Sequence, residues 1–414
     1  MSTTPEPVPA DGHPTDVVTQ LRGAWHDYVA RVRGGDMGVL PALLAMLMLT
    51  VLFWQKSEFF LTRLNIANLF VQAATLMVFT CALVFLIILT ELDLSAGVTG
   101  GTAMAVFIKL VKGGWPWGLS LFVALLVGAF TGLVLGFFVA KIGVPAFVVT
   151  LGFFLGFQGL MLVLLGDGGI FRIETKPLKA IMNDNLKPWM GWMMVVVVSA
   201  IAIGLSAYDR VRRSKRGLPN QPLALVMIKV GGGLALAAVI VAFLNVNRSK
   251  SAKQIQGVPI VVPIVLVILF IGQFVLQRTR FGLHIYAVGG NPEAARRAGI
   301  NVTMMRISGF VICSTLSVIG GLFHASRVGS IESTAGRQIV LSAVGAAVVG
   351  GVSLFGGRGN LKNAAIGAFV IAMIDNGLGL LQLKGGINFL VTGGVLVLAA
   401  SVDALSRKRN SARR

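Results

Sequence analysis

The sequence predicts an all-α polytopic membrane protein with about 10 to 12 transmembrane helices, including broken or re-entrant segments. Of its 414 residues, 55% are hydrophobic and only 13% are charged. That balance is too apolar for a water-soluble surface of this size, so most of the chain must face lipid. Long apolar runs also recur along the chain, each near the roughly 20 residues that one helix needs to cross a bilayer.

The apolar runs set the order of the expected spans. They cover residues 38–55, 67–90, 94–111, 117–140, 143–165, 190–208, 222–246, 258–277, 306–324, 340–355, 362–381 and 386–403. The runs 94–111 and 340–355 are short and rich in glycine. Such a segment need not cross the whole bilayer, so these two are the candidates for broken or re-entrant helices.

Polarity and charge divide the chain into three parts. Residues 1–37 form a polar tail that lacks the short apolar core of a cleaved signal peptide, 38–405 form the membrane domain, and 406–414 form a basic tail. Clusters of Lys and Arg at 210–216 and 407–414 indicate cytoplasmic loops, because cytoplasmic loops carry an excess of basic residues. We therefore expect a multi-pass protein with both termini in the cytoplasm.

Several functions are disfavoured by what the chain lacks. The formal net charge is +20, but the basic residues are scattered over many short loops, which does not indicate nucleic-acid binding. No G-x-x-x-x-G-K-[ST] loop is present, so we expect no ATP site on this chain. No nucleophile motif occurs and the histidines are dispersed, so we expect neither catalytic residues nor a metal site. The histidines are His13, His26, His284 and His324.

The polar loop 278–305 contains a short helix with signals at both ends. Asn291 can cap the helix, Pro292 suits its first turn, and Gly299 suits a left-handed stop. A helix this short is marginal in water unless something packs on it, which favours a docking site for a cytoplasmic partner over an ordinary connector. The candidate contact residues are Gly290, Asn291, Pro292, Glu293, Ala295, Arg296, Arg297 and Gly299.

Polar groups interrupt the apolar runs at two further places and mark a candidate translocation path. Residues 91–97 contain carboxylates that are expensive inside a membrane, so they are either structural caps or functional groups. Asp375 and Asn376 lie deeper in a run, where we favour a role facing a cavity. The candidate path residues are Glu91, Asp93, Ser95, Asp375 and Asn376.

Five strings occur in a fixed order along most of the chain. They are DLS-x-G, a VPAF string with VTLG, RT-x-FG with A-x-GGN-x-x-AA-x-x-x-GI, GG-x-SL-x-GG-x-G, and NGL, at 93–97, 144–152, 278–300, 350–359 and 376–378. In this combination the chain resembles the permease subunits of ribose-type and xylose-type ABC sugar importers. An inserted stretch at 166–257, with two extra spans, is similar to the xylose and multiple-sugar branch.

The resemblance implies a type II-like ABC importer permease in a bacterial inner or plasma membrane. It implies a permease homodimer, an extracytoplasmic sugar-binding protein, and a separate ATPase subunit that binds ATP and Mg and docks on the helix in 289–300. The cargo it implies is a neutral monosaccharide, a xylose-like pentose or a related hexose.

Two other classes fit the sequence less well. An ion-coupled secondary sugar transporter needs buried ionisable groups near the bilayer midplane, and only Lys229 and Asp375 are plausible, neither with an evident partner in the sequence. A membrane enzyme needs a nucleophile–base or metal constellation, which the sequence lacks. The importer permease is therefore the favoured hypothesis.

Overall fold

The computed structural model describes residues 40–166, 168–217, 223–249 and 254–383, and from the last apolar run residues 386–387, 390–395, 397–398 and 401. The predicted tails 1–37 and 406–414 lie outside the described residues. The chain forms two compact units, the first including Trp189–Phe243 and the second Met37–Pro188 with Leu244–Arg414.

The all-α membrane fold is confirmed. Among the described residues, eight helices are long and apolar enough to cross a membrane, and two shorter apolar helices accompany them. The only strands in this part of the chain are two three-residue segments that pair antiparallel, β1 (Ile170–Arg172) and β2 (Ser330–Glu332).

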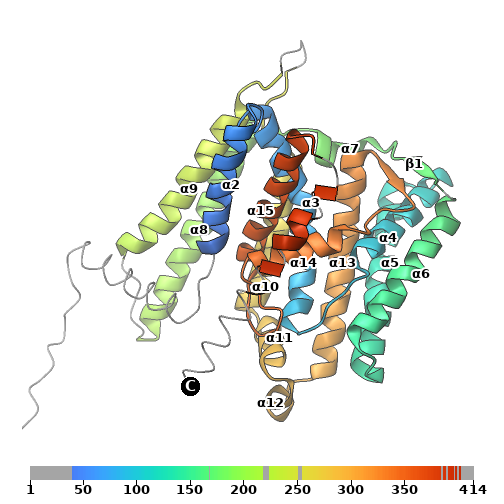
Figure 1. Cartoon of the computed structure of the whole chain (residues 1–414). Helices are drawn as coiled ribbons and strands as arrows, with labels where there is room; N and C mark the ends of the chain where they lie inside the picture. Colours follow the sequence, from blue (N-terminus) through green and yellow to red (C-terminus); the bar gives the residue numbers. More distant parts are fainter. Residues whose placement is uncertain are drawn as a thin grey trace, which may run out of the picture. The chain divides into compact units, whose positions relative to one another are not determined.

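The second unit is a helical bundle (Figure 1). Its helices are α2 (Leu40–Lys56), α3 (Arg63–Ile88), α4 (Ala96–Lys112), α5 (Trp117–Phe137) with the π-helix η1 (Phe138–Ile142), α6 (Ala146–Leu165), α7 (Lys176–Asn183), α10 (Val261–Arg278), α11 (Arg280–Gly290), α12 (Pro292–Arg297), α13 (Val302–Val328), α14 (Ile339–Val349) and α15 (Leu361–Leu380).

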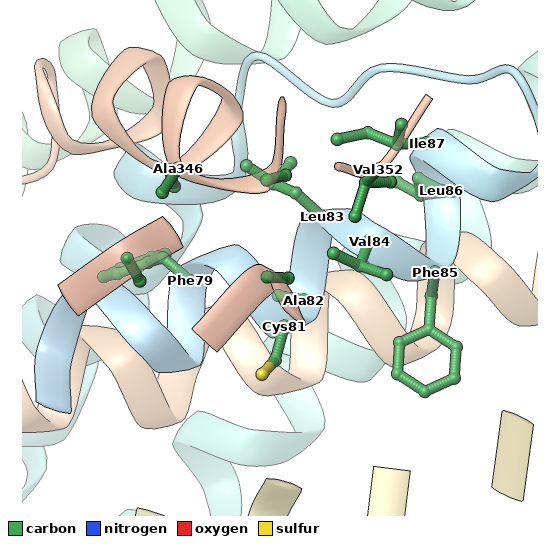
Figure 2. Packing of buried hydrophobic residues seen from close by; sticks show 14 of the residues in the cluster. Phe79, Cys81, Ala82, Leu83, Val84, Phe85, Leu86, Ile87, Ala346 and Val352 are labelled. Carbon is green, nitrogen blue, oxygen red and sulfur yellow. The ribbon is translucent and has the colours of Figure 1, made fainter. Parts of the chain in front are cut away.

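Helix α3 lies at the centre of this bundle. In its most apolar stretch of 18 residues, 83% of the residues are buried, although a helix in lipid could leave apolar side chains exposed at little cost. It packs against α10, α13, α14 and α15. Figure 2 shows the consecutive residues from Cys81 to Ile87 packed with Phe79, Ala346 and Val352. A helix that is apolar on all sides is expected to be surrounded by other helices.

A row of glycines allows α5 to approach α13 closely. A Cβ at Gly132 would lie 2.5 Å from the carbonyl oxygen of Phe310, and Gly128 and Gly136 are equally tight against α13. Small residues at four-residue spacing allow helix backbones to meet in this way in a membrane.

Helices α4 and α14 are the two interrupted elements, at the places where the sequence predicts broken segments. Helix α14 has 11 residues, so it is about 16 Å long and reaches roughly half-way across a bilayer core of about 30 Å. Helix α4 begins only at Ala96, after a non-helical stretch. A Cβ at Gly97 would lie 2.1 Å from the carbonyl oxygen of Gly336, so the starts of the two helices meet.

Two predicted boundaries are wrong. Helix α13 runs from Val302 to Val328 rather than over 306–324, because Asn301 caps its start and Gly329, at a φ of 77°, ends it. The first unit contains α8 (Pro188–Lys215) and α9 (Leu223–Asn245). Helix α8 continues through most of the basic cluster, which the sequence predicts to lie in a loop. Arg and Lys are good helix formers, and no Gly or Pro interrupts this stretch before Gly217.

Candidate functional site

The short helix predicted in the loop 278–305 is confirmed as α12. The Asn291 side chain accepts a hydrogen bond from the backbone N–H of Ala294 at 3.0 Å, and Pro292 occupies the first turn. Gly299 has a φ of 81°, the left-handed backbone expected of a helix stop. Local sequence chemistry therefore determines both ends of this helix.

Helix α12 lies at one end of the bundle, between α11 and the start of α13 (Figure 1). Ala295 is only 4% exposed and anchors it. Glu293 and Arg296 form an ion pair of 2.7 Å on its exposed side, where Arg297 is also exposed. An exposed pair of this kind adds little stability, so these charges are free to meet another molecule. Gly290, which precedes the cap, is exposed too.

Directly behind α12, three segments meet through their backbones. The N–H of Gly357 donates to the carbonyl oxygen of Ile88 at 2.9 Å, and a Cβ at Gly289 would lie 1.7 Å from that oxygen. The Tyr286 hydroxyl donates to the carbonyl oxygen of Gly359 at 2.6 Å. Partial burial raises the pKa of this hydroxyl, so it stays protonated and keeps its role as donor. We call this contact of residues 88–90, 286–290 and 356–359 the glycine joint.

The polar break before α4 holds Asp93 as a cap. Asp93 is fully buried, and its Oδ1 accepts hydrogen bonds from the backbone N–H of Ser95 at 2.8 Å and from the Ser95 hydroxyl at 2.5 Å. This side chain replaces helical hydrogen bonds that the break leaves unmade. Of the two interpretations of Asp93 that the sequence leaves open, its contacts are those of the structural cap.

Glu91 has a different partner. One of its carboxylate oxygens lies 3.2 Å from Nε of Arg306, in the first turns of α13. Burial raises the pKa of Glu91, and the positive charge of Arg306 opposes that rise. The pair therefore links the break to the helix that follows α12.

A polar cavity with a volume of about 1030 Å³ lies within the described residues. Gly97 and Gly101 of α4 and Gly336 and Ile339 at the start of α14 line one side of it. The polar lining comes mainly from α3, α13, α15 and the segment after β2. It consists of Gln72, Thr75, His324, Arg327, Glu332, Thr334, Arg337, Gln338, Ser342, Asp375 and Thr392.

Asp375 lines this cavity, and Asn376 does not. The carboxylate of Asp375 interacts electrostatically with the guanidinium of Arg327. Asn376 exchanges two hydrogen bonds with Asn65 of α3, at 2.9 and 3.0 Å, and contacts Gln72 at 3.4 Å. These hydrogen bonds turn the side chain of Asn376 toward α3, whereas Asp375 is turned toward the cavity. Glu91, Asp93 and Ser95 also lie away from the cavity lining.

The sequence interpretation missed the partner of Asp375. Arg327 lies beyond residue 324, where the sequence predicts the end of this span, although the helix continues to Val328. The absence of Gly and Pro between residue 324 and Gly329 is the sequence signal that favours this longer helix. The side chain of Lys229, the other ionisable candidate, lies outside the described residues. Among the described residues, no group of three or more His, Cys, Asp and Glu side chains could hold a metal ion.

Comparison with known proteins shows the family. The protein-family model described as "branched-chain amino acid transport system / permease component" matches residues 65–400. The xylose transport system permease protein XylH of Escherichia coli (strain K12) is 33% identical over 380 residues, 91% of this chain and 94% of that protein.

Two further relatives are more distant. The ribose import permease protein RbsC of Escherichia coli (strain K12) is 28% identical over 87% of this chain and 92% of its own. The fructose import permease protein FrcC of Rhizobium meliloti is 28% identical over 78% and 73%, respectively. No solved structure matches the chain. The family match covers residues 65–400, which include most of the described helices. The chain therefore belongs to this family of transport-system permease components, and it is a transport subunit rather than an enzyme.

Proposed function

We propose that this chain is the permease subunit of an ABC importer for a neutral monosaccharide, with a xylose-like pentose as the first candidate and a related hexose as the second. The observation that carries the proposal is the arrangement along α13. Its first residue follows the exposed helix α12, and its last turns line the polar cavity. A helix of 27 residues is about 40 Å long, so one rigid element joins the two places.

The cavity has the chemistry of a polyol path. A volume of about 1030 Å³ is ample for a monosaccharide. Its carboxylates can accept hydrogen bonds from sugar hydroxyls, and its arginines and amides can donate to them. Because Arg327 and Asp375 offset each other's charge, they do not require a charged cargo. The relatives are named for xylose, ribose and fructose, which are all neutral polyols.

The proposal includes partners. A separate ATPase subunit, which holds ATP and Mg, docks on Gly290–Gly299, and this chain carries no cofactor of its own. An extracytoplasmic binding protein delivers the sugar at the end of the bundle where β1, β2 and α7 lie. A second copy of the chain completes the transporter. The α12 end and both termini then face the cytoplasm.

An ion-coupled secondary transporter is the competing proposal. The Arg327–Asp375 pair is the one feature that favours it, since paired charges that line a path through the membrane can relay ions. Membership of a family of transport-system permease components argues against it, as does α12, for which a secondary transporter has no use.

Reconstituted transport tests the proposal. The permease, its ATPase and its binding protein should take up labelled xylose into proteoliposomes only when ATP reaches the ATPase. Ribose and fructose serve as comparison cargoes. Uptake driven by a proton gradient without ATP would overturn the proposal in favour of the secondary transporter.

The same uptake assay tests whether the cavity belongs to the translocation path. Asp375→Asn should lower uptake about 10-fold or more, because it removes a charged hydrogen-bonding group. Asp209→Asn is the matched control, since Asp209 is a carboxylate of α8 outside the cavity lining. Equal uptake by both variants would remove this cavity from the path.

A further inference from the structure

The glycine joint places the loop 278–305, here called the coupling loop, against two elements that lead to the cavity. Residue 88 leads through the break into α4, and residues 356–359 follow α14. Gly289, at the end of α11, is packed against both, with the Ile88 carbonyl oxygen 1.7 Å and the Gly357 nitrogen 3.0 Å from where its Cβ would lie. The atoms nearest to that position belong to the backbone, so displacement of one segment acts directly on the other two.

Arg306 and Glu91 form a second link beside the joint. Arg306 lies five residues after Asn301, the residue that joins the α12 loop to α13, and its side chain is 29% exposed. The Glu91 side chain is 11% exposed. In the described part of the chain, Arg306 is the charged group that acts on Glu91, and Nε of Arg306 makes no hydrogen bond. Within the described residues, Glu91 is the acidic side chain that forms an ion pair with Arg306.

The non-helical break at 89–95 connects the Arg306–Glu91 ion pair to the cavity through a few residues. Glu91 is followed by Asp93, whose side chain fixes the Ser95 backbone, and the first turns of α4 then present Gly97 and Gly101 to the cavity. Gly97 also touches Gly336 at the start of α14. A shift of Arg306 thus acts on the meeting point of the two interrupted helices through a few tightly packed residues.

We propose that Glu91 and Arg306 are a positioning pair that transmits movement of the coupling loop to the start of α4, and so to the cavity wall. The proposal rests on the proposed importer function for its energy source. It assigns no contact with cargo or nucleotide to either residue. It predicts that loss of the pair uncouples ATP hydrolysis from transport before it prevents assembly.

The experiment measures two quantities on Glu91→Gln, Arg306→Gln and the exchanged double variant Glu91→Arg with Arg306→Glu. The first is the number of xylose molecules taken up per ATP hydrolysed by the assembled complex in proteoliposomes. The second is amide hydrogen exchange of residues 89–97 in the permease alone. Each single variant should lower the ratio about 5-fold or more, the lower range of coupling between sites, and should speed exchange in the break. The double variant should restore part of both.

Arg248→Gln is the matched control for loss of a half-buried arginine. Its guanidinium donates to backbone oxygens of Leu244 and Gly257 and to Asn185, away from the joint. It should lower thermal stability and leave the transport ratio unchanged. Arg306→Lys, which keeps the charge, should retain more coupling than Arg306→Gln.

The positioning role is overturned if both single variants take up as many xylose molecules per ATP hydrolysed as the wild-type complex. If their melting temperatures are lowered while this ratio is unchanged, the pair is merely structural. If ATP hydrolysis by the wild-type complex responds to none of xylose, ribose and fructose, the proposed function itself fails, and faster exchange of residues 89–97 in Glu91→Gln would still establish the physical link.

Discussion

At the scale of single residues, the glycines of α5 show how this protein obtains stability without a hydrophobic driving force between its helices. Association in lipid depends on close packing, because lipid tails are as apolar as leucine. Gly128 and Gly132 both face α13, where an added Cβ would lie within 3.0 Å of its atoms. By contrast, Gly118 at the start of α5 has nothing within 4 Å.

Gly132→Ala should therefore destabilise the permease by about 1–3 kcal/mol, the usual cost of overpacking. Gly118→Ala on the same helix should be neutral or slightly stabilising, because alanine is the better helix former. Thermal unfolding in detergent, followed by the loss of monodisperse protein, measures the difference. A melting temperature for Gly132→Ala equal to that of Gly118→Ala would contradict the close packing of α5 on α13.

At the scale of elements, α12 is determined by its sequence and α14 by its surroundings. Asn291, Pro292 and Gly299 specify a six-residue helix with both ends satisfied. Helix α14 has the composition of a membrane span but ends after 11 residues. A Cβ at Gly350, which follows it, would meet the backbone of Asn363 at 2.3 Å, so packing against α15 accompanies its end.

Replacing Glu293, Arg296 and Arg297 together by Ala should lower sugar-stimulated ATP hydrolysis while the permease stays folded, because these exposed side chains make no contact that the bundle needs. The matched control replaces Asp209, Arg210 and Arg212 of α8, which removes the same number of acidic and basic charges. Unchanged stimulation in the α12 variant, or equal loss in the control, would remove α12 as the docking site. Gly299→Asn should be tolerated better than Gly299→Val, because a branched side chain strains a left-handed backbone.

At the scale of the whole molecule, orientation follows from charge. The last turn of α8 carries Arg212, Arg213 and Lys215. Dense basic clusters are retained in the cytoplasm, so this end of α8 should face the cytoplasm. The native cysteines, Cys81 and Cys313, are both buried, which keeps background labelling low.

Ser214→Cys should therefore resist an impermeant maleimide in intact cells and react after lysis. Lys179→Cys, at an exposed position of α7 near the proposed binding-protein end, should react in intact cells. Ready labelling of Ser214→Cys from outside would reverse the orientation of α8 and α9.

Local hydropathy and backbone chemistry are enough to predict the membrane class, the order of the spans, the two interrupted elements and the caps of α12. Which polar groups meet depends on the tertiary structure. Asp375 interacts with Arg327 in the lining of a cavity while Asn376 binds Asn65, and Glu91 lies beside Arg306. These partners are separated by tens to hundreds of residues, and their meeting depends on helix rotation and on glycine contacts that periodicity does not encode. In lipid an apolar side chain costs little on either face of a helix, so hydropathy places a span in the membrane without specifying which side faces the cavity.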